Sequence, residues 1–203
     1  MKIQKVLVAS PNYSAPEKNE AGDIRGVLGR AGFSPESPGF NYSRGEILDR
    51  LAGCAAVQAY DIARRFMRDA GVYQACELCD ATVVNLNGRT IDESSLVLAA
   101  YTAASGKPVV VYKNDGRTCF RYGDHPTVEG LDNFRIIHDI KRIPWAIRRH
   151  EHEKRQMFSG VTTITGIPKE ILESFRQAET QERDPTGRIR LKRIIKTYEK
   201  LIK

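Results

Sequence analysis

The stretch that decides the fold is residues 79–117, which read CDATVVNLNGRTIDESSLVLAAYTAASGKPVVVYKNDGR. It contains two short apolar runs, ATVVNL at 81–86 and PVVVY at 108–112, that are typical of buried strands. Residues 92–105 between them have the length of a helix, with acidic residues at the start and Gly106 as a C-terminal cap. A strand, a helix and a second strand in this order predict a βαβ unit of a parallel sheet.

The same alternation extends in both directions along the chain. Residues 3–9 are a further strand candidate, followed by an amphipathic helix over 17–31 and a Pro/Gly/Ser-rich loop over 34–45 with room for a short strand. Residues 46–78 have a helical pattern without proline, and 134–140 is another strand candidate. We therefore predict a flavodoxin-like, doubly wound α/β fold with a mainly parallel five-stranded sheet.

Ligands of such sheets bind beyond the carboxyl ends of the strands. The loops that follow the strands at that edge are residues 10–16, 86–95 and 113–127. We expect these three loops to line one pocket.

The net charge of +7 comes from the C-terminal part of the chain. Residues 1–140 carry 16 Lys/Arg against 17 Asp/Glu, whereas 141–203 carry 16 against 8. We predict an α/β domain over 1–148 and a basic helical extension over 149–203. The extension has apolar stripes at helical spacing but few aromatic residues, which favours solvated helix faces around a packed stripe over nucleic-acid binding.

Neither a signal-peptide core nor a membrane span is apparent, so no membrane association and a cytoplasmic location are expected. The pair Cys76 and Cys79 resembles a redox or zinc motif, but the position of Cys79 just before a strand favours simple packing. His150 and His152 diverge on a helix, so no metal and no other cofactor are predicted.

The 79–117 block resembles the nucleoside 2-deoxyribosyltransferase family. The resemblance rests on the Cys79–Asp80 pair before an apolar strand, the loop 87–89, Asp92–Glu93 at a helix start, and GKP at 106–108 before the next strand. SPNY at 10–13 and GDHPTVEGL at 123–131 resemble two further family segments, so the likeness covers about residues 3–148.

The resemblance implies an enzyme that breaks the N-glycosidic bond of a deoxynucleoside by attack of a glutamate on the anomeric carbon. That glutamate lies six residues after the helix-opening aspartate, and here the position is Leu98. A leucine offers no lone pair, so covalent chemistry of the family type is not expected. Direct attack by water would need another base, for which Asp92 and Asp80 are the candidates.

Other positions implied by the resemblance have also changed. Ser10 replaces a family glycine, and His125 replaces an asparagine that is often supplied to a neighbouring subunit's site. Asp69 is the nearest candidate for the family's base-binding aspartate. The loop residues Asn87 and Gly88 are retained.

Each of the remaining candidates has a structural alternative. Asp92 can hold a sugar or base, or cap the helix. Ser94 and Ser95 can bind a phosphate at the helix start, or serve as capping residues. Tyr13 can stack on a base, or pack in its loop. His125 can transfer a proton, or be an ordinary exposed histidine.

Three functions remain open from the sequence. The chain is a nucleoside or nucleotide N-glycosidic transferase or hydrolase without the usual nucleophile, a non-catalytic nucleotide-sensing pseudoenzyme, or an assembly or nucleic-acid protein that acts through its tail. The resemblance and the apolar stripes of the tail also predict a homodimer or larger homo-oligomer. Fold alone does not decide among these functions.

Overall fold

The computed structural model describes residues 2–88, 92–115, 128, 130–132, 135–152, 168–180 and 191–201. Their contacts divide the chain into two compact units, Met1–Ser37 with Ala75–Thr162, and Pro38–Gln74 with Thr163–Lys203. This division differs from the boundary expected after residue 148. The segment 38–74 groups with the C-terminal helices because aromatic side chains from both form one core.

The first unit contains a five-stranded, fully parallel sheet in the order β2-β1-β3-β4-β5. This strand order is that of the flavodoxin-like fold and confirms the predicted fold class. The order reverses between β1 and β3. The strands are β1 (Lys5–Ala9), β2 (Ser34–Glu36), β3 (Ala81–Asn85), β4 (Val109–Tyr112) and β5 (Ile136–Ile137).

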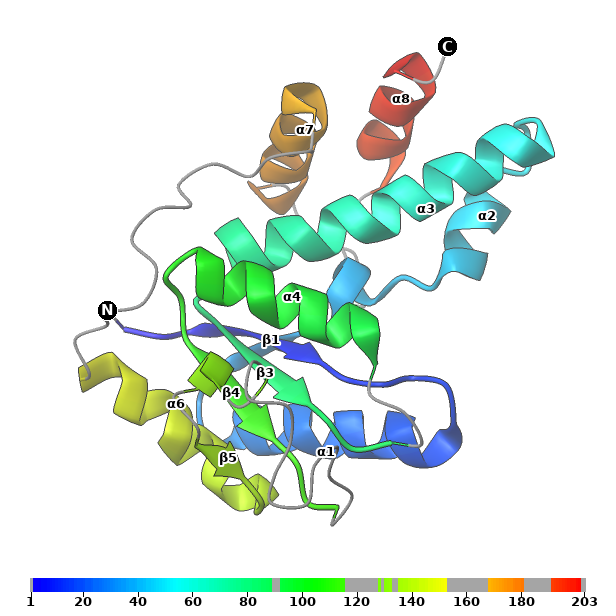
Figure 1. Cartoon of the computed structure of the whole chain (residues 1–203). Coiled ribbons are helices and arrows are strands. Elements are labelled where there is room, and N and C mark those ends of the chain that lie inside the picture. Colours follow the sequence, from blue (N-terminus) through cyan, green and yellow to red (C-terminus); the bar gives the residue numbers. More distant parts are fainter. Residues whose placement is uncertain are drawn as a thin grey trace. The chain divides into compact units, whose positions relative to one another are not determined.

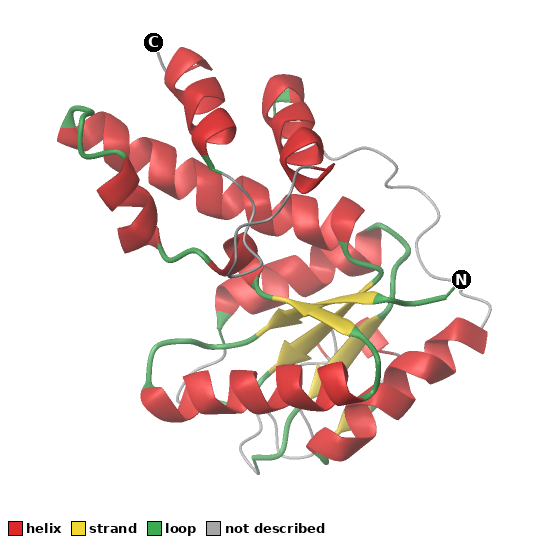
Figure 2. Cartoon of the chain, turned by 180° about the vertical axis from the view of Figure 1, so that it is seen from behind, coloured by secondary structure: helices red, strands yellow, loops and turns green. Residues whose placement is uncertain are grey.

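Helices cover both faces of this sheet (Figures 1 and 2). On one face α1 (Ala15–Arg30) and α6 (Ile143–His152) pack against residues such as Val83 and Val110, and on the other α4 (Glu93–Ala104) packs against Val84 and Val111. The strands are apolar on both sides because both sides are covered. The predicted helix at 92–105 is therefore confirmed.

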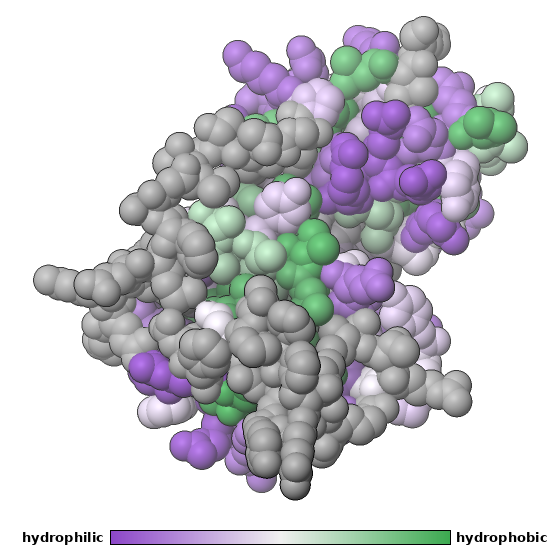
Figure 3. All heavy atoms as spheres, viewed as in Figure 1, coloured by the Kyte–Doolittle hydropathy of each residue, from purple (hydrophilic) through white to green (hydrophobic). Residues whose placement is uncertain are grey.

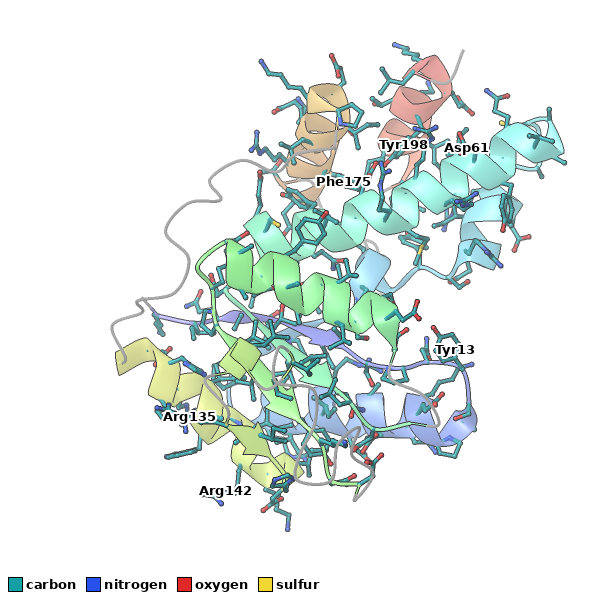
Figure 4. The ribbon with its side chains drawn as sticks, in the orientation of Figure 1. Tyr13, Asp61, Arg135, Arg142, Phe175 and Tyr198 are labelled. Atoms are coloured by element: carbon teal, nitrogen blue, oxygen red, sulfur yellow. The ribbon has the colours of Figure 1, made fainter. Side chains whose placement is uncertain are left out.

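The second unit is helical. It contains η1 (Pro38–Asn41), α2 (Arg44–Arg50), α3 (Ala56–Tyr73), α7 (Lys169–Thr180) and α8 (Lys192–Leu201), while η2 (Gln74–Leu78) joins α3 to the first unit. Its core is an aromatic cluster in which Phe175 packs on Phe40, Phe66 and Tyr73 at centroid distances of 5.3–6.0 Å. Figure 4 shows Phe175 directed towards α3.

Two details of this unit differ from the sequence pattern. The helical stretch expected over 46–78 is interrupted at Leu51–Ala55, where Gly53 lies in a turn. In the tail, Ile171 and Ile194 are buried as the apolar stripes predict, but Leu201 is 47% exposed at the end of α8. Figure 3 shows hydrophilic side chains over α3. Arg64 and Arg65 of this helix are exposed.

Among the described helices, none combines the length and the apolar character that crossing a membrane requires.

Candidate functional site

The candidate site lies where the strand order reverses, at the carboxyl ends of β1 and β3. The chain leaves β1 through Ser10 to Tyr13 and leaves β3 towards Asp92. The Tyr13 hydroxyl donates a hydrogen bond of 2.8 Å to Asp92 Oδ1, which joins the two loops. Loops 10–16 and 86–95 therefore share one end of the sheet, as predicted.

The beginning of the third predicted loop joins them. Asn87 Oδ1 accepts the backbone N–H groups of Asn114 at 2.9 Å and Asp115 at 3.3 Å. Gly88 follows with φ of +126°, a conformation that favours glycine. The rest of this loop, including His125, lies outside the described residues, so the role predicted for His125 stays a prediction.

Asp92 is buried at the start of α4, and four hydrogen bonds converge on its carboxylate. Oδ2 accepts the Ser95 N–H at 3.0 Å, the Ser94 hydroxyl at 2.8 Å and the Ser95 hydroxyl, and Oδ1 accepts Tyr13. Burial is the largest single influence and opposes ionisation, but the bonds from Ser95, Ser94 and Tyr13 together outweigh it and lower the pKa of Asp92. The aspartate is therefore an anion at neutral pH.

The cap of α4 is Asp92, and the two serines support it because each hydroxyl donates to the Asp92 carboxylate. Their expected role in phosphate binding stays a prediction. The negative charge of Asp92 would repel a phosphate at this helix start. Asp92 itself combines the N-cap role with a position at the candidate site.

Tyr13 presents a flat aromatic surface beside this carboxylate. Its side chain is 76% exposed, yet the hydrogen bond to Asp92 fixes the position of its hydroxyl group. That bond, together with the negative charge of Asp92, raises the pKa of the Tyr13 phenol and keeps it a donor. An exposed ring held at one end is suited to stacking on a planar ligand.

A second carboxylate at this edge, Glu20 of α1, is absent from the sequence prediction. Its Oε2 accepts Asn85 Nδ2 at 2.9 Å, and its Oε1 accepts Asn87 Nδ2 at 2.6 Å. Asn85 Nδ2 also donates to Ser10 Oγ at 3.0 Å. Burial and then the charge of Glu20 raise the pKa of Tyr112 nearby.

These contacts fasten α1 to the carboxyl end of β3 and, through Asn85, to Ser10 after β1. A signal for these contacts exists in the sequence, because Glu20 precedes the buried Ile24 and Leu28 at intervals of four residues. Helical residues with this spacing lie on one face, so the carboxylate had to face the sheet.

The position of the family nucleophile is part of the apolar core. Leu98 is 8% exposed and packs in a cluster with Leu7, Ala9, Ala75 and Cys79. The other buried members of the cluster are hydrocarbon side chains and the Cys79 thiol, whose pKa is raised by burial. The surroundings of Leu98 are therefore suited to a hydrocarbon side chain.

Two further acidic candidates have structural partners elsewhere. Asp80 Oδ2 accepts the N–H groups of Gln4 at 2.8 Å and Lys5 at 2.9 Å, at the amino end of β1. The carboxylate of Asp69 is fully buried in the second unit and accepts the Tyr198 hydroxyl and Arg68 Nε, each at 2.6 Å. Hydrogen bonds thus join Tyr13, Asp92, Ser94 and Ser95 in one group. Ser10 and Asn87 belong to a second group, linked through Asn85 and Glu20. Asp80 lies at the opposite end of the sheet from both.

Among the described residues, no group of three or more His, Cys, Asp or Glu side chains is arranged to hold a metal ion. The described cysteines, Cys54, Cys76 and Cys79, are thiols, and burial raises the pKa of both members of the Cys76–Cys79 pair. A raised pKa is unfavourable for a reactive thiolate, which agrees with the packing interpretation.

Comparison with family models and with curated proteins gives no match. Among solved structures, 73% of the chain matches 99% of a conserved protein from Enterococcus faecalis V583, at 17% identity and a TM-score of 0.56. A 2-deoxyribosyltransferase from Bacillus psychrosaccharolyticus matches 69% of the chain over 90% of its own length, at 14% identity and a TM-score of 0.50. At these identities the similarity establishes the architecture: this chain shares the fold of a 2-deoxyribosyltransferase.

Proposed function

We propose that the chain is a divergent member of the nucleoside 2-deoxyribosyltransferase family that binds a nucleoside or nucleotide and hydrolyses its N-glycosidic bond. The observation that carries this proposal is the hydrogen bond between Tyr13 and Asp92. It joins an exposed aromatic ring to an ionised carboxylate at the point of the sheet where flavodoxin-like folds bind their ligands.

The role that we propose for each side chain follows from its contacts. Within the described part of the chain, Asp92 Oδ1 accepts one hydrogen bond, whereas Oδ2 accepts three. We assign the contact with a sugar hydroxyl, a water or a base N–H to Oδ1, because the described residues donate fewer hydrogen bonds to it than to Oδ2. Tyr13 supplies a stacking face for the base.

We assign Ser10, Asn87 and Gly88 to the same site because they follow β1 and β3 at this end of the sheet, and Ser94 and Ser95 hold Asp92 in place. His125 remains a candidate proton donor on the basis of the family resemblance. We leave Asp69 out of the proposed site because Tyr198 and Arg68 occupy its two carboxylate oxygens.

Hydrolysis fits these residues better than transfer. In hydrolysis a water oxygen bonds to the anomeric carbon as the bond from that carbon to the base nitrogen breaks. Asp92 accepts the proton of the water, and the departing base takes up a proton. Transfer would require the sugar to remain on the protein as an ester, and Leu98 cannot form one. The lowered pKa makes Asp92 a weak base, so turnover should be slow.

A second candidate function is non-catalytic nucleotide sensing. The apolar cluster around Leu98 favours it, because that position has become part of the core. Under this proposal the same residues bind the ligand and release it unchanged.

Self-association is a further part of the proposal. The exposed side of α4 carries Val97, Ala100 and Tyr101 and no charged residue after Glu93. An uncharged apolar helix face is typical of a surface that another subunit covers.

The test is a panel of ribonucleosides, deoxynucleosides and their 5′-monophosphates, with binding measured by calorimetry and base release by chromatography. We expect at least one member to bind, and Asp92→Asn to weaken its binding or stop base release. Glu93→Gln is the matched control, because it removes the neighbouring exposed charge of the same helical turn. Ligand binding and base release that are both unchanged in Asp92→Asn would refute the proposed site. Binding of a ligand by the wild-type chain without release of its base would favour the sensing function.

A further inference from the structure

The carboxylate of Glu20 is bonded to both side-chain amides at the end of β3. Its Oε1 accepts Asn87 Nδ2 at 2.6 Å, and its Oε2 accepts Asn85 Nδ2 at 2.9 Å. A carboxylate accepts hydrogen bonds and donates none, whereas an amide side chain has one end that donates and one end that accepts. Glu20 therefore fixes the orientation of both amides, because each must present its NH2 group to the carboxylate.

The orientation of the Asn87 amide decides how the loop after β4 is held. With its NH2 group on Glu20, this amide directs its Oδ1 to the backbone N–H groups of Asn114 at 2.9 Å and Asp115 at 3.3 Å. If the amide were turned over, its NH2 group would face these two N–H groups, donor against donor, and both hydrogen bonds would be lost. The loop after β4 is therefore connected to α1 through the side chain of Asn87.

Asn85 repeats this arrangement on the side of β1. Its NH2 group donates to Glu20 and, at 3.0 Å, to Ser10 Oγ, while its Oδ1 accepts the backbone N–H of Asn87 at 2.9 Å. Turning this amide over would set its NH2 group against that N–H. The Tyr112 hydroxyl is also hydrogen-bonded to Glu20 and Asn87, but a hydroxyl group both donates and accepts and so imposes no orientation. The donor and acceptor pattern at the ends of β1, β3 and β4 is thus set by Glu20.

We propose that Glu20 is a positioning residue of the candidate site, whose carboxylate sets the amide orientations that hold the loops after β1, β3 and β4 together before a ligand binds. A site whose loops are already ordered loses less conformational entropy on binding than a site whose loops become ordered only then. The importance of Glu20 for ligand binding rests on the proposed function, whereas its effect on the loop after β4 does not. Glu20 is assigned no contact with the ligand and no step of the reaction.

Glu20→Gln tests the carboxylate, because glutamine is nearly isosteric with glutamate but carries an NH2 group. That group must face the NH2 group of Asn85 or of Asn87, and turning the asparagine over only moves the donor–donor contact to a backbone N–H. We expect hydrogen exchange at the Asn114 and Asp115 N–H groups, followed by NMR on the full chain, to become about tenfold faster, as the loss of a hydrogen bond to a charged group predicts.

The reversed pair, Glu20→Gln/Asn87→Asp, should restore the wild-type pattern. The NH2 group at position 20 then donates to the carboxylate at position 87, which also accepts the N–H groups of Asn114 and Asp115. The remaining oxygen at position 20 accepts Asn85 Nδ2, so every donor again has an acceptor at unchanged total charge. We expect exchange in the loop to return to within about threefold of the wild-type rate. Asn87→Asp alone sets two carboxylates face to face and should accelerate exchange as Glu20→Gln does.

Ligand binding tests the connection to the site. For a nucleoside or 5′-monophosphate that the wild-type chain binds, Glu20→Gln should raise Kd about tenfold, because fewer molecules keep the arrangement that binds. The rate of base release at saturation should stay within about threefold, because Glu20 does not contact the ligand. A wild-type chain that binds no member of the panel would contradict the proposed function, and the exchange measurements would still decide whether Glu20 orients the amides.

The matched control is Asp23→Asn, which removes an exposed carboxylate from the same helix and should leave exchange in the loop within about twofold of the wild-type rate. Three results would overturn the proposal. They are unchanged exchange in Glu20→Gln, equal acceleration in Glu20→Gln and Asp23→Asn, and a reversed pair that exchanges as fast as the single variants. A raised Kd without any change in exchange would mean that Glu20 contacts the ligand directly, which equally contradicts a positioning role.

Discussion

Replacing Asp92 by alanine should destabilise the chain because two contributions are lost together. The first is the N-cap of α4, which is worth about 1 kcal/mol at such a position. The second is the hydrogen bond that the Ser95 hydroxyl donates to Asp92. This hydroxyl is buried, so without its acceptor it would remain unsatisfied at a cost of about 1–3 kcal/mol. We therefore expect Asp92→Ala to lower the free energy of unfolding by about 2–4 kcal/mol, measured by urea denaturation.

Asp92→Asn separates the charge of this group from its capping role. Asparagine caps helices about as well as aspartate, so this variant should retain most of the stability near neutral pH. The pKa of Asp92 is lowered in the folded chain, so its ionised form contributes stability above the unfolded value of about 3.9. This contribution disappears as the pH falls through the folded pKa, and Asp92→Asn should lack that part of the acid dependence.

The reasoning would be refuted if Asp92→Ala unfolded within about 0.5 kcal/mol of the wild-type chain, the usual range for an unconnected surface substitution. It would also be refuted if Asp92→Asn and the wild-type chain lost stability in parallel between neutral and acidic pH. Either result would mean that the four hydrogen bonds at the start of α4 are not formed in solution.

Three further predictions concern other parts of the chain. Leu98→Glu should destabilise the chain by several kcal/mol in urea denaturation, because it buries a carboxylate among hydrocarbon side chains. The volume-conserving control Leu98→Met should cost less than about 1.5 kcal/mol, and equal effects of the two variants would contradict the packing of Leu98. Tyr198→Phe should lower the free energy of unfolding by about 1.5–3 kcal/mol by the same method, because the buried Asp69 carboxylate loses a hydrogen bond. Burial and the charge of Asp69 raise the pKa of Tyr198, so the wild-type chain should lose the stabilisation by this hydrogen bond above about pH 10, whereas the variant should not. Light scattering at micromolar concentration should give at least a dimer mass, and Tyr101→Lys on the exposed side of α4 should lower it; a monomer mass for the unmodified chain would refute self-association.

Most of the first unit follows from the apolar periodicity of the sequence. The runs at 81–86 and 108–112 are apolar throughout because helices cover both faces of the sheet, and this pattern predicts β3 and β4 within a residue or two. Gly106 adopts φ of +71° after α4, as its predicted capping role requires. The strand order, however, depends on contacts between distant segments, so apolar periodicity alone does not predict it.

The candidate site could be predicted only in part. Tyr13 and Asp92 lie in loops that follow neighbouring parallel strands, and the topology brings such loops together. Glu20 lies within α1 and not in a loop, so the rule that ligands bind beyond the strand ends does not predict it. Its spacing from Ile24 nevertheless places it on the helix face towards the sheet. The second unit was missed because nothing local in the segment 38–74 shows that Phe40 and Tyr73 pack on Phe175 of the tail.

The central claim is that the chain cleaves an N-glycosidic bond with water and does not hold the sugar as an ester. The most direct measurement is chromatography of a deoxynucleoside, or its 5′-monophosphate, incubated with the wild-type chain and a different free base. The account predicts slow release of the original base, dependent on Asp92, and no nucleoside that contains the added base. Formation of that new nucleoside would contradict the account, because it would require a covalent nucleophile that Leu98 cannot be.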